Sequence, residues 1–170
     1  MKISFVIPAY NEEAILAQCL ESIFREIEKT KCDAEVIVVD NASSDKTSEI
    51  ARSFSEAKLV FEPRKGISPA RQAGYLAASG DLIANVDADT MLTPGWIEKV
   101  LEEFSKNPKL VALSGPFIYH DVSTFTRALT RTFYVISFTV YILNNHILRI
   151  SSMLQGGNYV VSKTALNQLG

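Results

Sequence analysis

Cysteine is scarce in this sequence, with only Cys19 and Cys32 among 170 residues. Two cysteines provide no disulfide framework, so we expect a protein of a reducing compartment, the cytoplasm. Cys19 falls on the apolar side of a predicted helix, where a thiol serves as a small buried side chain. The sequence therefore excludes the disulfide-stabilised class of secreted domains.

Patterns typical of several other protein classes are also absent. None of the eight glycines forms G-x-G-x-x-G, which excludes a dinucleotide-binding module. A formal net charge of −2 is unlike the basic surface that nucleic-acid binding needs, so no nucleic-acid partner is expected. Internal repeats are absent, and Met1-Lys2 leads straight into a strand pattern, so no signal peptide is expected.

Long hydrophobic runs are missing as well. The apolar and aromatic stretch at residues 133–143 is about a dozen residues long, whereas a membrane span needs ~20. Arg127, Arg131 and Arg149 flank this stretch within residues 123–152. The pattern fits a helix that packs in the core or between subunits. It also fits a helix on the inner face of a membrane, with arginines toward anionic head groups. Peripheral membrane contact and oligomerisation therefore both stay open.

What the sequence does contain is an ordinary globular composition with a regular order of elements. Hydrophobic residues make up 47% and charged residues 21%, which suits one soluble domain with a real core. Strand and helix patterns alternate from residue 2 to residue 113, and this predicts an α/β fold with a mostly parallel sheet and helices on both faces. Strands are predicted at residues 2–7, 36–39, 59–61, 82–86 and 110–113, and helices after Asn11, Ser43-Ser44, Ser68-Pro69 and Thr93-Pro94.

Two carboxylates with one small residue between them follow the predicted strand 82–86. Asp87 and Asp89 would lie at the carboxyl end of that strand, where ligands bind in open α/β sheets. Two acids so close repel each other unless a cation lies between them, and hard oxygen ligands favour Mg²⁺ or Mn²⁺. The alternative is that both are solvated turn residues before the next helix. Polar loops at residues 8–11 and 40–45 should face the same crevice, because parallel strands end at one edge.

Five segments of the chain carry recognisable motifs: Ser4–Glu13, Glu35–Asp45, Gly66–Gly74, Asp87–Asp89 and Gly156–Asn158. Together they resemble glycosyltransferase family 2, whose members have the Rossmann-like GT-A fold that binds nucleotide sugars. Each motif is weak alone, but all five occur in family order over almost the full length.

The resemblance implies an inverting, metal-assisted hexosyltransferase of polysaccharide or glycolipid biosynthesis. It implies a UDP- or GDP-sugar donor, a glycan or lipid-linked acceptor, and Mg²⁺ or Mn²⁺ as cofactor. The residue roles that it implies are a base and ribose pocket (Pro8, Ala9, Tyr10, Glu12), a nucleobase contact (Asp40), a phosphate contact (Arg71), a ribose or metal-water contact (Asp87), a metal ligand (Asp89, with Asp87 beside it) and an acceptor side (Gly156, Gly157, Asn158). For Asp40 the alternative is a helix N-cap, and for Arg71 it is a solvated helix residue.

The sequence departs from the family pattern in two places. The family commonly has a second acid after the acid of the second strand, and here that position is Asn41. The family's catalytic base usually follows a Gly-Gly-Phe-acid stretch that would begin where this sequence ends. We therefore expect one GT-A domain cut short, with residues 1–115 binding the nucleotide sugar, residues 116–170 beginning the acceptor part, and the base beyond Gly170. Asp121 is the candidate base if the chain already contains one.

Rival functions fit less well. Aspartyl-phosphate phosphatases also place D-x-D after an apolar strand, but they carry threonine where this chain has Met91, and their motif follows the first strand. A sugar-nucleotide pyrophosphorylase would show a glycine-rich loop after the first strand, and Pro8–Asn11 contains no glycine. A domain that binds nucleotide sugar without turning it over stays open as an alternative.

Overall fold

The computed structural model describes residues 1–115, 124–144 and 156–168. Asp121 and Arg149, which the sequence analysis singles out, lie outside the described residues, as do the side chains of Arg127 and Arg131. The chain forms two compact units, one of residues 1–113 with 156–170 and one of residues 114–155. The first unit contains the sheet and the cleft.

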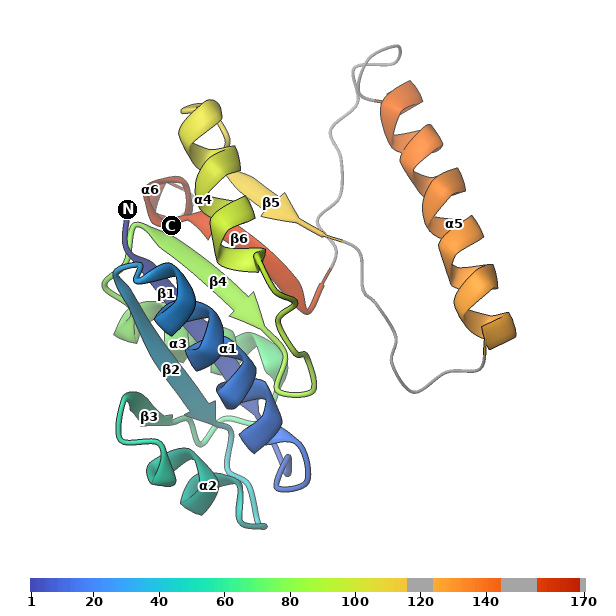
Figure 1. Ribbon diagram of the computed structural model, residues 1–170. Helices are drawn as coiled ribbons and strands as arrows, with labels where there is room; N and C mark the ends of the chain where they lie inside the picture. The colour runs from blue at the N-terminus through green and yellow to red at the C-terminus, as the bar shows by residue number, and fades with distance from the viewer. Residues whose placement is uncertain (116–123, 145–155, 169–170) are drawn as a thin grey trace. The chain divides into compact units, whose positions relative to one another are not determined.

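A six-stranded sheet forms the centre of the first unit (Figure 1). Its strands are β1 (Ile3–Ala9), β2 (Ala34–Asp40), β3 (Ala57–Phe61), β4 (Leu82–Val86), β5 (Ala112–Ser114) and β6 (Asn158–Ser162), in the spatial order β3-β2-β1-β4-β6-β5. The pairs β1–β2, β1–β4 and β2–β3 are parallel, while β4–β6 is antiparallel. The predicted α/β class with a mostly parallel sheet is confirmed.

Strand β6 is the part of the sheet that the alternation pattern did not predict. It comes from the end of the chain and lies between β4 and β5, with Asn158 opposite Val86. This pairing brings the Gly156-Gly157-Asn158 segment to the end of the strand that precedes Asp87. Residues 156–168 therefore belong to the same compact unit as the nucleotide-binding motifs.

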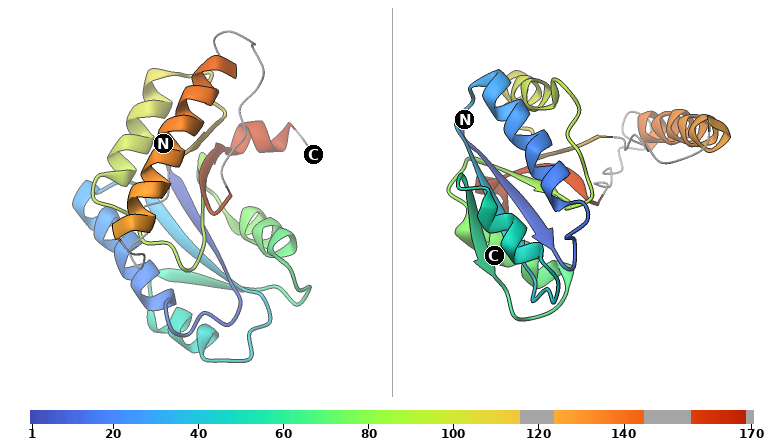
Figure 2. Two further views of the ribbon diagram at one scale, coloured as in Figure 1. Left: turned by 90° about the vertical axis from the view of Figure 1, so that its right-hand side faces the viewer. Right: turned by 60° about the horizontal axis from the view of Figure 1, so that its bottom comes forward.

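Helices cover both faces of the sheet, as predicted. Helices α1 (Leu16–Thr30), α2 (Thr47–Ser53) and α4 (Trp96–Lys106) contribute to one apolar core, while α3 (Ile67–Ala77) and α6 (Lys163–Asn167) contribute to the other. Figure 2 shows the sheet between these layers. Helix α1 buries Leu16, Leu20 and Ile23 completely, and each such side chain stabilises the fold by about 1.5–3 kcal/mol.

Three predicted helix starts are wrong. Helix α3 begins at Ile67, directly after Gly66, so Ser68-Pro69 lies inside its first turn and does not precede it. Asn11 does not cap the first helix, because its backbone is left-handed (φ 56°) and its Oδ1 accepts a hydrogen bond from the Ser44 amide at 2.9 Å. Helix α1 begins only at Leu16. Helix α4 likewise begins at Trp96 rather than at Thr93-Pro94, after a left-handed Gly95. The side chain of Asn11 is thus used to join the loop after β1 to the loop after β2, and it does not cap the helix.

The second unit contains helix α5 (Thr124–Ile142), whose side chains are largely apolar. Leu129, Phe133 and Phe138 are among its exposed side chains. Among the described residues, none of the helices combines the length and the hydropathy that crossing a bilayer requires.

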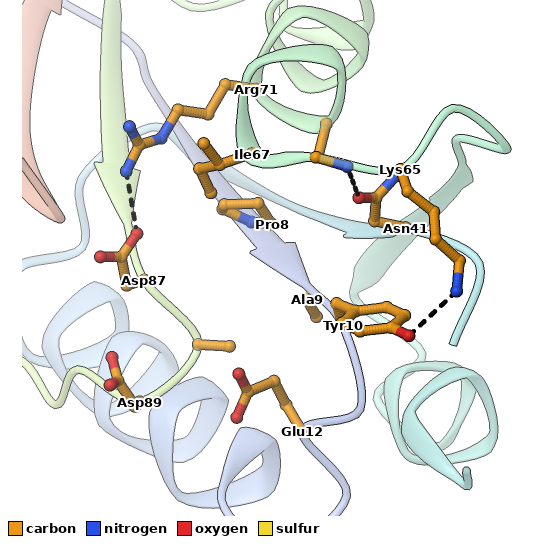
Figure 3. A pocket seen from close by; sticks show the side chains of 13 residues that line it. Pro8, Ala9, Tyr10, Glu12, Asn41, Lys65, Ile67, Arg71, Asp87 and Asp89 are labelled. Carbon is orange, nitrogen blue, oxygen red and sulfur yellow. Dashed lines mark hydrogen bonds and ion pairs between the residues drawn. The ribbon is translucent and has the colours of Figure 1, made fainter. Parts of the chain in front are cut away.

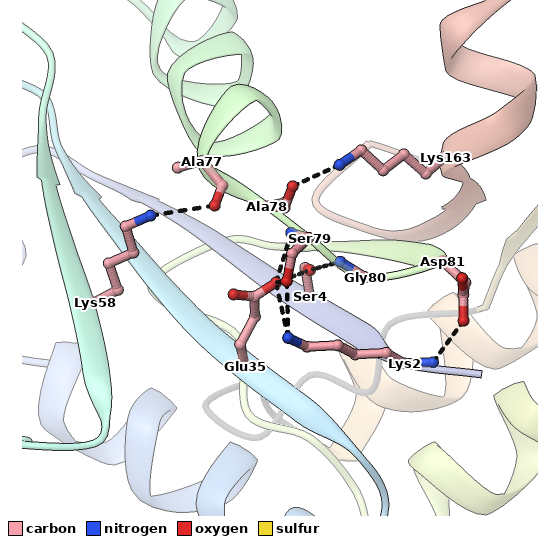
Figure 4. A network of polar contacts seen from close by, with 10 residues as sticks. All are labelled: Lys2, Ser4, Glu35, Lys58, Ala77, Ala78, Ser79, Gly80, Asp81 and Lys163. Atoms are coloured by element: carbon pink, nitrogen blue, oxygen red, sulfur yellow. Dashed lines mark hydrogen bonds and ion pairs between the residues drawn. The ribbon is translucent and has the colours of Figure 1, made fainter.

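At the amino-terminal edge of the parallel strands, a polar network joins β1, β2 and the end of α3 (Figure 4). Glu35 accepts hydrogen bonds from Ser4 Oγ (2.5 Å) and from the Ser79 amide (2.6 Å) and hydroxyl (2.8 Å), and it lies 3.8 Å from Lys2 Nζ. A side chain at Gly80 would come within 2.8 Å of Ser4 Oγ and the Lys2 carbonyl, so only glycine fits there. Burial opposes ionisation of Glu35, but the hydrogen bonds and Lys2 outweigh it and lower its pKa to about 2.

Glu35→Gln is expected to destabilise the protein in a pH-dependent way. A carboxylate whose pKa is lowered by folding stabilises the protein above its unfolded pKa, and this contribution is lost as pH falls from about 5 to about 2. After allowance for its partial exposure, the contribution is about 1–3 kcal/mol at pH 7. Urea unfolding of both proteins across this pH range measures it. Glu28→Gln, at an exposed position, is the matched control. A difference between Glu35→Gln and the original protein that does not change with pH would contradict this account.

Candidate functional site

A cleft of about 500 Å³ lies at the carboxyl edge of the parallel strands (Figure 3). The loops after β1, β2, β3 and β4 all reach it, as the parallel topology predicts. Its lining residues are Pro8, Ala9, Tyr10, Glu12, Asn41, Lys65, Gly66, Ile67, Ala70, Arg71, Asp87, Ala88 and Asp89. The cleft therefore unites motifs that lie up to eighty residues apart in the sequence.

Most of the predicted site residues line this cleft, and four do not. Those in the lining are Pro8, Ala9, Tyr10, Glu12, Arg71, Asp87 and Asp89. Gly156, Gly157 and Asn158 lie beside it, and the Gly157 carbonyl accepts a hydrogen bond from the Asp87 amide at 2.9 Å. Asp40 is buried and is not part of the lining.

The acidic end of the cleft contains three carboxylates that come from two loops. The carboxylates of Glu12 and Asp89 point into the same space (Figure 3). Burial, and then the negative charges of Asp89, Asp45 and Asp87, raise the pKa of Glu12. In the described part of the chain, Asp89 accepts no hydrogen bond from another side chain or amide. This crowding of negative charge, with oxygen atoms free to coordinate, fits a hard divalent cation.

Arg71 connects α3 to this acidic end. Its Nη2 donates to Asp87 Oδ1 at 3.0 Å, and its guanidinium carbon lies 5.5 Å from the centre of the Tyr159 ring. Arg71 Nε is buried without a hydrogen-bond partner among the described residues. An unpaired buried donor is costly, so a donor left at the wall of a cleft is suited to an anionic ligand. The solvated-helix alternative for Arg71 does not describe this geometry.

A polar stripe on α1 holds the loop that carries the two aspartates. Ser22 Oγ accepts from the Leu92 amide at 2.9 Å, and Glu26 Oε2 accepts from the Gly95 amide at 2.8 Å. The two acceptors are four residues apart and therefore lie on one face of the helix. Both are buried, so the segment after Asp89 is anchored at two points.

Cys19 belongs to the same stripe, one turn earlier. Its thiol lies 3.8 Å from the Asp87 carbonyl, which also accepts from the Thr90 amide at 2.9 Å. Burial first, and the nearby carboxylates second, raise the pKa of Cys19 to about 12. Cys19 is thus the buried, unreactive thiol that its position in the sequence predicts.

Asp40 is 3% exposed, and its two carboxylate oxygens bind the loop after β2 and the first turn of α2. Oδ1 accepts from the Ser43 amide at 3.0 Å, and Oδ2 accepts from the Ser48 hydroxyl. Burial opposes ionisation, but these hydrogen bonds prevail and lower the pKa of Asp40. The geometry is that of a loop-ordering acid, so its contact with a nucleobase stays a prediction.

The other end of the cleft combines an aromatic ring with a cation. Tyr10 is 47% exposed, and Lys65 Nζ donates to its hydroxyl at 2.9 Å while lying 4.7 Å from the ring centre. Sequence reasoning missed Lys65. The available signal was a basic residue directly before Gly66, the glycine from which α3 starts.

The comparison with protein families agrees with the motifs. The model of Glycosyl transferase family 2 matches residues 4–170. The chain belongs to this family.

Individual curated glycosyltransferases are similar to about three fifths of the chain. The uncharacterized glycosyltransferase EpsJ of Bacillus subtilis is 29% identical over 109 residues, which cover 62% of this chain and 31% of EpsJ. Glycosyltransferase AglE of Haloferax volcanii is 35% identical over 108 residues, which cover 61% of this chain and 35% of AglE. The chain thus spans about a third of the length of these curated relatives.

Solved structures of glycosyltransferases share the fold. The Pyrobaculum calidifontis mannosyltransferase PcManGT, in complex with GDP-Man and Mn²⁺, gives a TM-score of 0.71 at 22% identity, covering 99% of this chain and 46% of that one. Glucosyl-3-phosphoglycerate synthase of Mycobacterium tuberculosis, in complex with Mn²⁺, UDP and phosphoglyceric acid, gives 0.66 at 23% identity, covering 97% and 57%. This family 2 domain therefore has the GT-A fold.

Proposed function

We propose that this family 2 domain binds a UDP- or GDP-sugar and takes part in transferring its hexosyl group, with inversion, to an acceptor hydroxyl. The observation that carries the proposal is the polarity of the cleft. Asp87, Asp89 and Arg71 lie at one end, and the exposed ring of Tyr10 lies at the other. A nucleoside diphosphate has a charged diphosphate at one end and a flat base at the other. The diphosphate therefore suits the charged end of the cleft, and the base suits the Tyr10 end.

We propose Asp89 as the principal metal ligand, with Asp87 beside it. Among the described residues no three acidic, cysteine or histidine side chains form a ready metal site. Mg²⁺ and Mn²⁺ suit this arrangement, because such ions keep several waters and take the rest of their ligands from substrate phosphates. When bound, the cation acts as a Lewis acid that neutralises the charge developing on the leaving diphosphate. Metal and nucleotide should therefore bind together more tightly than either alone.

The protein's own groups then orient the donor. Arg71 and the acidic end fix the diphosphate, so that the anomeric carbon faces the side formed by Gly156–Asn158. The acceptor hydroxyl attacks that carbon in line, and a carboxylate base takes its proton. We propose that this base belongs to the part of the relatives' sequences that this chain does not cover.

The complexes of the similar structures support the choice of donor and metal. PcManGT was solved with GDP-Man and Mn²⁺, and the mycobacterial synthase with UDP and Mn²⁺.

The position of the two aspartates along the chain argues against the phosphatase alternative, because Asp87 and Asp89 follow β4 and not the first strand. Metal-dependent hydrolysis of a UDP- or GDP-sugar distinguishes a catalytic domain from one that only binds the donor. Release of UDP or GDP that EDTA abolishes supports turnover.

Two further assignments follow from the family pattern. Asp40 is proposed to contact the base in addition to ordering its loop. Asp40→Ala separates the two roles when nucleotide affinity and melting temperature are both measured, with Ser48→Ala as the control that keeps the carboxylate. We likewise propose that residues 1–115 form a nucleotide-binding part and that an acceptor part begins at residue 116.

We also propose that this protein works in the cytoplasm and contacts the inner membrane surface through residues 123–152. The apolar, exposed side chains of α5 support this, together with the arginines of that segment. Co-sedimentation with anionic liposomes should exceed that with neutral ones and should fall with salt. Replacing Arg127 and Arg131 by glutamate should release the protein, whereas the same change at Arg25 and Arg52 should not. Equal sedimentation with both liposomes, or none at low salt, would instead favour a packing role.

A further inference from the structure

The loop between β3 and α3, residues 62–66, is fixed in place by one side chain. Asn41 Nδ2 donates to the carbonyls of Glu62 (2.9 Å) and Arg64 (2.8 Å), and its Oδ1 accepts from the Gly66 amide at 2.7 Å. Asn41 is 5% exposed. Both of its N–H groups are therefore used by this loop, and none is left to read a ligand.

A second interaction fixes the same loop from within. Glu62 accepts from Arg64 through two nitrogens of the guanidinium, at 2.9 and 3.0 Å, and also from the Arg64 amide at 2.9 Å. The hydrogen bonds and charge of Arg64 lower the pKa of Glu62 to about 2, so the pair stays ionised at neutral pH. Gly66, at φ 129°, then turns the chain into α3. A surface loop of five residues is thus held rigidly.

What this rigid loop presents to the cleft is Lys65. In the described chain, Lys65 forms no ion pair, and one of its three N–H groups is donated to the Tyr10 hydroxyl. Its other donors are free at the aromatic end of the cleft (Figure 3). Because Lys65 only donates, it favours a ligand edge that accepts hydrogen bonds and disfavours one that donates.

We propose that Lys65, positioned by Asn41, selects donors whose base presents a keto oxygen beside Tyr10. Uracil, thymine and guanine present such an oxygen where cytosine and adenine present an amino group. The proposal rests on the proposed function, since it requires a nucleoside diphosphate in this cleft with its base at the Tyr10 end. It also explains the departure at Asn41. An aspartate there could accept from Gly66 but could not donate to the carbonyls of Glu62 and Arg64.

The test compares two pairs of ligands in the presence of Mn²⁺, UDP against CDP and GDP against ADP. UDP and CDP differ in the keto or amino group at C4 of the base and in the proton on the adjacent N3. The part of the ratio of their Kd values that depends on Lys65 is therefore measured by comparing the original protein with Lys65→Met. One of the two pairs will bind more tightly than the other. Within that pair, the original protein should bind the keto ligand more tightly than the amino ligand, by about ten-fold or more. Lys65→Met should lower this ratio several-fold, and Lys65→Arg should keep most of it. Lys109→Met, which removes an exposed lysine that does not line the cleft, should change nothing.

Asn41→Asp tests the positioning role. It should reduce the same ratio, and it should add no further loss in a chain that already carries Lys65→Met, because both changes act through one side chain. If Asn41→Asp does not fold, Lys65→Met decides alone. Equal weakening of all four ligands by Lys65→Met, or an unchanged ratio, would overturn the proposal while leaving the nucleotide site in place. Failure of all four nucleotides to bind the original protein would instead overturn the proposed function, and the base-selection proposal with it.

Discussion

Asp89→Asn is expected to abolish the Mn²⁺-dependent binding of nucleoside diphosphates while the domain stays folded. The carboxylate of Asp89 accepts no hydrogen bond within the described residues and lines the acidic end of the cleft together with Glu12. Removing its charge removes the proposed metal ligand and also relieves repulsion with Glu12. The melting temperature should therefore hold or rise, whereas the affinity for UDP or GDP with Mn²⁺ should fall below detection by calorimetry.

Asp87→Asn provides the comparison for this result. Asp87 is already held by Arg71 at 3.0 Å, and the asparagine oxygen can still accept from that arginine. We therefore expect a smaller loss of affinity than for Asp89→Asn. Glu28→Gln, at an exposed position outside the cleft, controls for the change in net charge. Unchanged Mn²⁺-dependent affinity in Asp89→Asn would remove Asp89 as the metal ligand.

A chain extended beyond Gly170 through the next acidic residues is expected to transfer glycosyl groups about 10²–10⁴ times faster than the 170-residue chain. This is the usual contribution of a positioned proton acceptor. Donor affinity should stay the same, because the residues that line the cleft all lie between Pro8 and Asp89. Single-turnover transfer from UDP- and GDP-sugars to a panel of glycan and lipid-linked acceptors measures the difference.

The control for this second prediction is donor binding by both chains under the same conditions. Equal binding with unequal transfer supports a missing base. Equal transfer by the two chains would show that a carboxylate of the present sequence is the base. Asp121 would then be the first residue to replace, with Asp33→Asn as a matched control.

The main features of the fold followed from local patterns in the sequence. The buried strands β1, β2 and β4 are short apolar runs that end at polar loops, and such runs are recognisable without tertiary information. Their parallel order alone predicts that Pro8, Tyr10, Asp87 and Asp89 lie at one edge of the sheet. Strand β6 could not be found in this way, because its place beside β4 depends on a pairing between segments more than seventy residues apart.

Some contacts of the site could not be predicted, for one physical reason. Asn11 and Asn41 are small polar residues after a strand, and in the fold the side chain of each is used by another loop. Asn11 accepts from the Ser44 amide, and Asn41 makes three hydrogen bonds to residues 62–66. Such contacts depend on which loops are brought together, and no local pattern encodes them. Lys65 was missed for the same reason.

Calorimetric titration of UDP and GDP into the original chain, with Mn²⁺ and then with EDTA, tests the central claim most directly. The claim is that the cleft at the carboxyl edge binds a nucleoside diphosphate through a divalent cation held by Asp89. It predicts saturable binding of at least one of the two nucleotides with Mn²⁺, one site per chain, and loss of that binding with EDTA. Binding of neither nucleotide, or binding of equal affinity in EDTA, would contradict it.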